Sequence, residues 1–187
     1  MKIFKPFLAV LLLGLACSRL HADTFEAGTP VSHTPYDAYM GPMYTVFGHL
    51  GEGQPDMAVV ESLMREGRGF RYYFNSAQPY VPQAPEDTDK IHAGDCKAKS
   101  LWLAYKMDTR KIRFMIGKFR STSTCSHAWL LWNGPNGWLV LDATNYSQPL
   151  GPGQVSATQF IPQYCYTTGG KFSYAASAEN GGKYGDH

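Results

Sequence analysis

The chain has 187 residues, of which 44% are hydrophobic, 14% aromatic and 17% charged, so it can build a core and is not an intrinsically disordered chain. Its formal net charge of +2 is too close to neutrality for a dedicated nucleic-acid-binding protein. Four cysteines are too few for a disulfide-rich scaffold, but they are enough for one disulfide and one thiol reserved for chemistry.

The first 22 residues have the pattern of a secretory signal peptide. Lys2 and Lys5 form a basic start, and the apolar run over residues 7–16 is too short for a membrane-spanning helix. Cleavage after Ala22 would remove three basic residues and no acidic ones, which changes the formal net charge from +2 to −1. We therefore expect an exported protein, periplasmic or secreted, with no stable membrane span. Lipidation of Cys17 is the alternative.

The predicted organisation has three parts. Residues 1–22 form the signal peptide, and residues 23–174 form one domain that begins with a wrapping segment. Residues 175–187 are rich in small and polar residues and are expected to form a flexible C-terminal tail.

The predicted elements are sparse in the first half of the domain. Residues 23–55 lack a sustained period and predict loops with short extended pieces, whereas Asp56 can cap a helix that runs to about Arg65. Residues 76–89 contain three prolines and predict a loop that cannot hold a helix. A second helix is expected to begin near Asp95, and its buried face would consist of Ala98, Leu101, Trp102 and Tyr105.

Cys96 lies in the first turn of this second predicted helix. Free backbone N–H groups and the positive end of the helix dipole favour an anion there, so we expect this thiol to ionise more readily than a free one. A single cysteine is more often a small buried thiol, so a chemical role depends on the residues around it.

A strand is expected over residues 112–117, and a hairpin follows it. Strand-like runs cover residues 126–132 and 137–144. The four residues between them, Asn133-Gly134-Pro135-Asn136, are all of types that favour turns and therefore predict one. If these four residues form the loop, His127 lies directly opposite Asp142 on the same face, about 5 Å apart at Cβ. The carboxylate would then fix the imidazole tautomer and leave the other ring nitrogen to take the proton of a thiol.

Three motifs together resemble the core of the transglutaminase-like superfamily, in particular the small bacterial transglutaminase-like cysteine proteinases. They are Gly94-Asp95-Cys96 at the start of a helix, His127-Ala128-Trp129 on a strand, and the run over residues 137–144. The resemblance implies an α+β, papain-like fold in which the helix that carries the nucleophile packs on a small antiparallel sheet. It further implies a triad of Cys96 as nucleophile, His127 as general base and acid, and Asp142 as orienting carboxylate. No cofactor is expected.

The side chain that would complete the oxyanion hole does not follow from this resemblance. Relatives of papain place a Gln about six residues ahead of the nucleophile, where this chain has Lys90. The candidates are Gln83 and Tyr80 on the proline-rich loop, in addition to the backbone N–H of Cys96.

The remaining cysteines predict a disulfide. If Cys17 leaves with the signal peptide, Cys125 and Cys165 are expected to pair in an oxidising compartment, which leaves Cys96 as the odd thiol.

The function predicted from these features is that of an exported thiol acyl-transfer enzyme, chiefly a cysteine peptidase or amidase that works through a thioester. Its expected substrate is a peptide, a protein or a cell-wall peptide. No nucleic-acid partner is expected, and the sequence does not indicate an oligomeric state. Three alternatives stay open: a protein-glutamine transglutaminase with an amine acceptor, a non-catalytic binding or scaffold module, and a zinc site of His92, Cys96, Cys125 and His127.

Overall fold

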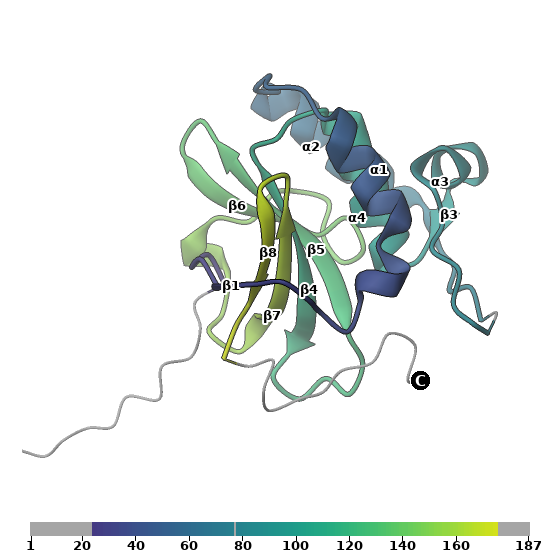
Figure 1. Ribbon diagram of the computed structural model, residues 1–187. Helices are drawn as coiled ribbons and strands as arrows, with labels where there is room; N and C mark the ends of the chain where they lie inside the picture. Colours follow the sequence, from purple (N-terminus) through teal and green to yellow (C-terminus); the bar gives the residue numbers. More distant parts are fainter. Residues whose placement is uncertain (1–23, 77, 176–187) are drawn as a thin grey trace, which may run out of the picture.

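The computed structural model describes residues 24–76 and 78–175 (Figure 1). The predicted signal peptide and the predicted tail beyond residue 175 lie outside the described residues. The helices are α1 (Gly41–His49), α2 (Met57–Gly69), α3 (Pro85–Ile91) and α4 (Cys96–Met107), with short 3₁₀ turns at Asp37–Tyr39 and Pro152–Gln154. The strands are β1 (Thr29–Val31), β2 (Arg71–Tyr72), β3 (Ala93–Gly94), β4 (Ile112–Arg120), β5 (His127–Gly134), β6 (Gly137–Leu141), β7 (Gln159–Thr167) and β8 (Gly170–Ser173).

The strands form one large antiparallel sheet and one small parallel pair. The large sheet has six strands in the order β1-β8-β7-β4-β5-β6, and each neighbouring pair is antiparallel. The small pair consists of β2 and β3, which precede α4. This arrangement confirms the predicted α+β class, with the helix that begins at Cys96 packed on an antiparallel sheet.

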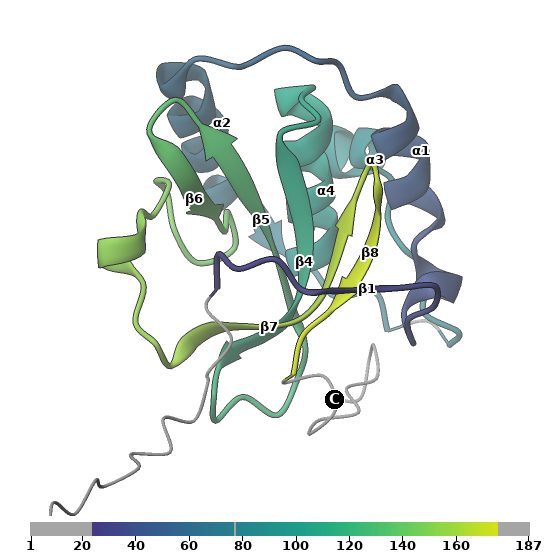
Figure 2. The ribbon, with the colours of Figure 1, turned by 60° about the vertical axis from the view of Figure 1, so that its left-hand side comes forward.

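Helices α1, α2 and α4 cover one face of the large sheet (Figures 1 and 2). The core between them contains Val60, Met64, Trp102, Phe114, Leu130, Trp132 and Leu141. A second cluster packs on the other face and contains Met115, Trp129, Leu131, Val140, Phe160, Cys165 and Tyr174. No helix among the described residues is long and apolar enough to cross a bilayer.

The helix α4 is buried on more than the single face that the periodicity predicts. Ala98, Leu101 and Trp102 are buried as expected, but Lys99, Ser100, Leu103 and Ala104 are buried as well. Tyr105, the last residue of the predicted buried face, is instead 43% exposed. Elements pack around α4 from several directions, so most of its first nine residues lack contact with solvent.

Two short helices were not expected from the sequence. The helix α1 lies within residues 23–55, and α3 lies within the proline-rich segment 76–89 and extends to Ile91. Each helix has its proline in the first turn, where the missing N–H group would have no helical acceptor in any case. A proline there starts a helix and does not break it.

The hairpin of β5 and β6 has a tighter turn than predicted. Asn133 pairs with Trp138 and Gly134 pairs with Gly137, so only two residues form the loop. Gly137 has a φ of 105°, which a residue with a side chain rarely adopts. The pairing is therefore shifted by two positions from the predicted one, and His127 is not directly opposite Asp142. A shift by two keeps both side chains on the same face of the sheet, because the side-chain period is two.

Gly117 on β4 pairs with His127, and the ladder to β7 shifts its register at this point. A Cβ atom on Gly117 would lie 2.0 Å from the carbonyl oxygen of Ile161, so the backbone would have to move. We expect Gly117→Ala to lower the free energy of unfolding by roughly 1–3 kcal/mol in a denaturant titration. Gly48→Ala in α1, where the new Cβ meets nothing within 4 Å, is the matched control and should not lower it. Equal stability of the two variants would contradict the packing argument.

Candidate active site

Cys96 is the first residue of α4, and Asp95 holds the helix end that carries it. Oδ1 of Asp95 accepts hydrogen bonds from the backbone N–H groups of Lys97 and Ala98, both at 2.9 Å. The carbonyl oxygen of Asp95 accepts the N–H of Lys99 at 3.0 Å. The carboxylate thus takes two of the four N–H groups that a helix leaves without acceptors at its start, and the bond from Lys99 is the first regular bond of the helix. Within the described residues, the N–H of Cys96 is left for another acceptor.

The second carboxylate oxygen of Asp95 is also occupied. It accepts a hydrogen bond from the Tyr80 hydroxyl at 2.9 Å and pairs with Nζ of Lys97 at 3.0 Å. Burial and the charge of Asp95 raise the pKa of Tyr80 well above its usual value, so this phenol keeps its proton. The Tyr80 hydroxyl therefore supports the helix end.

Gln83, the other predicted oxyanion candidate, has a similar supporting position. Its Nε2 lies 2.8 Å from Oγ1 of Thr88 and 2.8 Å from the carbonyl oxygen of Ala93. Both amide hydrogens thus have acceptors within the chain. The structure places neither Gln83 nor Tyr80 with a hydrogen free for an oxyanion.

His127 and Asp142 meet at the edge of the sheet nearest to the start of α4. His127 begins β5, Asp142 follows the last residue of β6, and Nε2 of His127 lies 2.9 Å from Oδ2 of Asp142. Because Nε2 faces the carboxylate, Nδ1 is left for the Cys96 thiol, which hydrogen-bonds the His127 side chain. Phe119 and Trp129 contact the imidazole, with ring centroids 5.5 and 6.1 Å from it. The structure thus brings all three predicted triad residues together.

The protonation of His127 is set by these neighbours. Burial alone would lower the pKa of His127, but the hydrogen bond and charge of Asp142, together with those of Cys96, raise it to about 10. The imidazolium form is therefore favoured at neutral pH.

Asn145 contacts the site residues, although the sequence analysis did not select it. Its Nδ2 donates to Oδ2 of Asp142 at 2.8 Å and lies 3.5 Å from Nε2 of His127. Oδ1 of Asp142 accepts the N–H of Thr144 at 3.0 Å, and the N–H of Asn145 reaches the Asp142 carbonyl at 3.2 Å. An Asp followed three residues later by Asn within one turn is the local signal that would have found this residue.

Two buried side chains of α4 connect this helix to its surroundings. Nζ of Lys99 donates to the carbonyl oxygen of Phe70 at the end of α2, at 2.6 Å. Burial lowers the pKa of Lys99, and the charge of Asp142 opposes that shift. Oγ of Ser100 donates to the carbonyl oxygen of Ala128 at 3.2 Å, which joins α4 to the strand that carries His127.

The predicted disulfide between Cys125 and Cys165 is wrong, because the three cysteines of the described residues are all free. Cys165 is buried on β7 opposite Met115, and burial raises its pKa to about 12. Cys125 is exposed in the turn before β5, beyond the pair of Gly117 and His127. Cys125 and Cys165 are thus at least two strand positions apart along the strands, or roughly 7 Å or more, in addition to their separation across the sheet.

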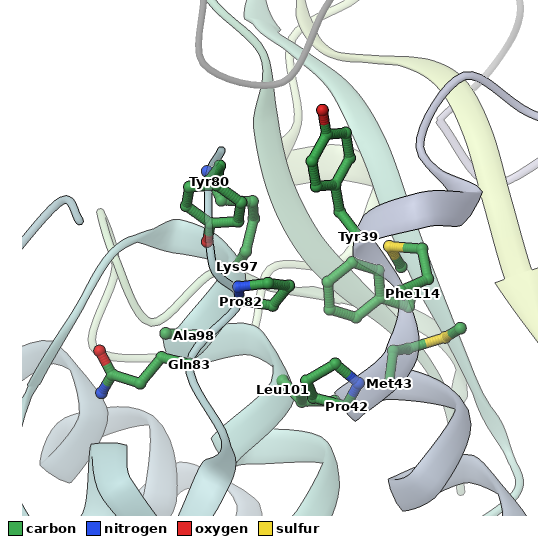
Figure 3. A pocket seen from close by; sticks show the side chains of 11 residues that line it. Tyr39, Pro42, Met43, Tyr80, Pro82, Gln83, Lys97, Ala98, Leu101 and Phe114 are labelled. Carbon is green, nitrogen blue, oxygen red and sulfur yellow. The ribbon is translucent and has the colours of Figure 1, made fainter. Parts of the chain in front are cut away.

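A shallow apolar hollow lies beside the first turn of α4 (Figure 3). The chain around α1 contributes one wall, and the loop before α3 contributes the opposite wall. Its lining includes Tyr39, Pro42, Met43, Pro82, Leu101 and Phe114. The hollow also touches Lys97 and Ala98, the two residues that follow Cys96.

The sequence matches no family model and none of the curated proteins compared with it. Among solved structures, it is similar to LapG of Legionella pneumophila, a transglutaminase-like cysteine protease. Calcium-bound LapG is 15% identical, with a TM-score of 0.50 over 74% of this chain and 77% of that chain. EGTA-treated LapG is also 15% identical, with a TM-score of 0.51 over 77% of this chain and 78% of that chain. The predicted fold is thereby confirmed.

The described residues do not present a metal site. No three or more His, Cys, Asp or Glu side chains in residues 24–76 and 78–175 are grouped to hold an ion. The ring of His92, one of the four predicted zinc ligands, stacks on Phe70 with a centroid distance of 4.9 Å. The four residues of the zinc alternative are therefore not grouped as a metal site in the described residues.

The variant Asp142→Asn tests the origin of the raised pKa of His127. The amide keeps the shape of the carboxylate but lacks its charge, so the pKa of His127 should fall from about 10 toward its ordinary value of 6.5. An NMR titration of the imidazole resonances measures this shift. Asp37→Asn, which removes the carboxylate paired with Lys171, is the matched control and should leave the titration of His127 unchanged.

The same shift gives a pH dependence of stability. The pKa of His127 is raised in the folded state, so the ion pair contributes fully to the free energy of unfolding below pH 6.5. That contribution is lost as the pH rises toward about 10. The stability difference between wild type and Asp142→Asn should shrink over this range, and a difference that grows with pH would contradict the assignment.

Proposed function

We propose that this chain is an exported cysteine peptidase or amidase that hydrolyses amide bonds with Cys96, His127 and Asp142. One observation carries the proposal: the Cys96 thiol at the N-terminus of α4 hydrogen-bonds a histidine whose Nε2 lies 2.9 Å from a buried carboxylate. A nucleophile, a base and a group that orients the base are thus in contact.

The first half of the reaction forms a thioester. The Cys96 thiolate attacks the carbonyl carbon, a C–S bond forms, and the C=O π pair moves to oxygen, where the Cys96 N–H donates a hydrogen bond. The tetrahedral intermediate collapses when the C–N bond breaks, and Nδ1 of His127 gives its proton to the departing amine. Asp142 holds the ring in place throughout and stabilises its charged form.

The second half consumes the thioester with water. His127, now neutral, takes a proton from water while the hydroxide oxygen bonds to the acyl carbon. Collapse of this second intermediate releases the acid and the Cys96 thiolate, and the imidazolium is restored. A primary amine in place of water would make the same thioester the donor of a transglutaminase, and the product mass distinguishes the two acceptors.

The proposed substrate is a peptide, a protein or a cell-wall peptide. The apolar hollow in Figure 3 touches the two residues after Cys96, so a side chain close to the scissile bond would reach it. Its lining of aromatic, proline and methionine residues favours an apolar side chain over a charged one.

Selective labelling of Cys96 tests the proposal. We expect iodoacetamide and electrophilic amide probes to label Cys96 at neutral pH, and Cys96→Ala to abolish this labelling, as followed by mass spectrometry of peptides. His127→Ala should slow labelling roughly 100-fold, because the base and counter-ion are lost.

Cys125→Ala, which removes the exposed thiol, is the matched control and should keep the Cys96 label. Labelling lost only in Cys125→Ala would overturn the assignment of the nucleophile. An inert Cys96 in the wild-type protein would favour the scaffold alternative.

Asn145→Ala is expected to lower kcat roughly tenfold with little change in KM, because a hydrogen bond to the charged Asp142 is lost. The pH profile of kcat should also shift, since the carboxylate then holds the imidazole less firmly. Asn133→Ala on the exposed β5–β6 hairpin serves as the control. Unchanged kcat and an unchanged pH profile in Asn145→Ala would remove Asn145 from the site.

A further inference from the structure

We infer that Tyr72 is the second oxyanion donor of this site, so that its phenol O–H and the Cys96 backbone N–H hold the developing negative charge together. The inference rests on the proposed function and names a catalytic residue that the motifs do not contain.

The oxyanion hole is incomplete without a side-chain donor. The first turn of α4 has only the Cys96 N–H left to offer within the described residues. Oxyanion holes typically use two or more donors aimed at the charge that develops in the transition state. Tyr80 and Gln83 have acceptors of their own, so another side chain must supply the remaining hydrogen bond.

The backbone places Tyr72 beside the segment that delivers the nucleophile. Tyr72 on β2 is in register with Gly94 on β3, and Gly94 is two residues ahead of Cys96. The N–H of Tyr73 donates to the Gly94 carbonyl at 3.1 Å, which fixes this parallel pairing. Neighbouring strands lie about 4.8 Å apart, and a tyrosine side chain is longer than that distance. The side chain of Tyr72 is therefore long enough to extend from β2 toward Cys96.

The charges that act on the phenol come from residues at or next to the site. Burial and the charges of Cys96, Asp95 and Cys125 all raise the pKa of Tyr72 above its usual value. Cys96 begins α4, whereas Cys125 lies in the turn before the strand of His127. The Tyr72 phenol is therefore close enough to both thiols for their charges to act on it.

The Tyr72 hydroxyl is free to bind substrate. It has no hydrogen-bond partner among the described residues, and the side chain is 53% exposed. A raised pKa means that the phenol keeps its proton at neutral pH and acts as a donor. During attack, the S–C bond forms and the carbonyl electron pair moves to oxygen. The phenol hydrogen bond strengthens as that charge develops, and the proton stays on Tyr72.

Two reactions of the Cys96 thiol distinguish an oxyanion donor at Tyr72 from a residue that acts on the thiol itself. Acylation of Cys96 by p-nitrophenyl acetate passes through a tetrahedral oxyanion, whereas alkylation by iodoacetamide displaces iodide at a saturated carbon and forms none. For Tyr72→Phe we expect the acylation rate, followed by p-nitrophenolate release, to fall roughly 100-fold. The alkylation rate should stay within about twofold of wild type, and it also shows that the variant is folded around an active thiol.

Tyr73→Phe is the matched control, because Tyr73 is an adjacent, 43% exposed phenol whose ring lies under Arg71. Both of its rates should equal those of wild type. Wild-type acylation by Tyr72→Phe would overturn the inference and leave the proposed function standing. A parallel fall of both rates would show that Tyr72 acts on the thiolate, which also overturns it. A wild-type Cys96 inert to both reagents would overturn the proposed function itself.

Discussion

Burial of the first turn of α4 leaves its backbone N–H groups without water, so each of them needs an acceptor within the protein. One oxygen of the Asp95 carboxylate takes two of them, and the other carboxylate oxygen holds Tyr80 and Lys97. One residue therefore caps the helix, anchors the loop that passes over it, and leaves the Cys96 N–H for a substrate oxygen. The rest of the proposed site depends on this cap, because it sets both the position of the thiol and the hydrogen-bonding capacity beside it.

The sheet supplies the other half of the site through strand ends. His127 begins β5 and Asp142 follows β6, so both side chains emerge where the sheet meets the start of α4. Asp142 is nearly fully buried, and its charge is compensated by His127, Asn145 and the Thr144 N–H. A carboxylate held by this many donors keeps the imidazole in one orientation, which the proposed acid–base role of His127 requires.

Buried polar contacts join α4, which carries Cys96, to the sheet that carries His127 and Asp142. Lys99 bonds the end of α2 and Ser100 bonds β5, so α4 has little freedom to shift relative to the histidine strand. The fold is shared with LapG at 15% identity. The segment from β2 to α3 packs against α4 through α3 and carries Tyr72, Tyr80 and one wall of the hollow. Substrate preference in the proposed enzyme would thus reside in a segment outside the large sheet.

The sequence by itself determined the features that local periodicity and capping control. Asp95 as N-cap, Cys96 in the first turn, and the shared face of His127 and Asp142 all follow from short-range rules, and the shared face survives the two-residue shift of the hairpin. Only the tertiary structure decided the contacts between distant segments. The register of β7 against β4 separates Cys165 from Cys125. The path of the loop over α4 gives Tyr80 and Gln83 hydrogen-bond acceptors within the chain, whereas the Tyr72 hydroxyl has none among the described residues. Those outcomes depend on which strands pair and how loops pack across the sheet, and no spacing along the chain encodes them locally.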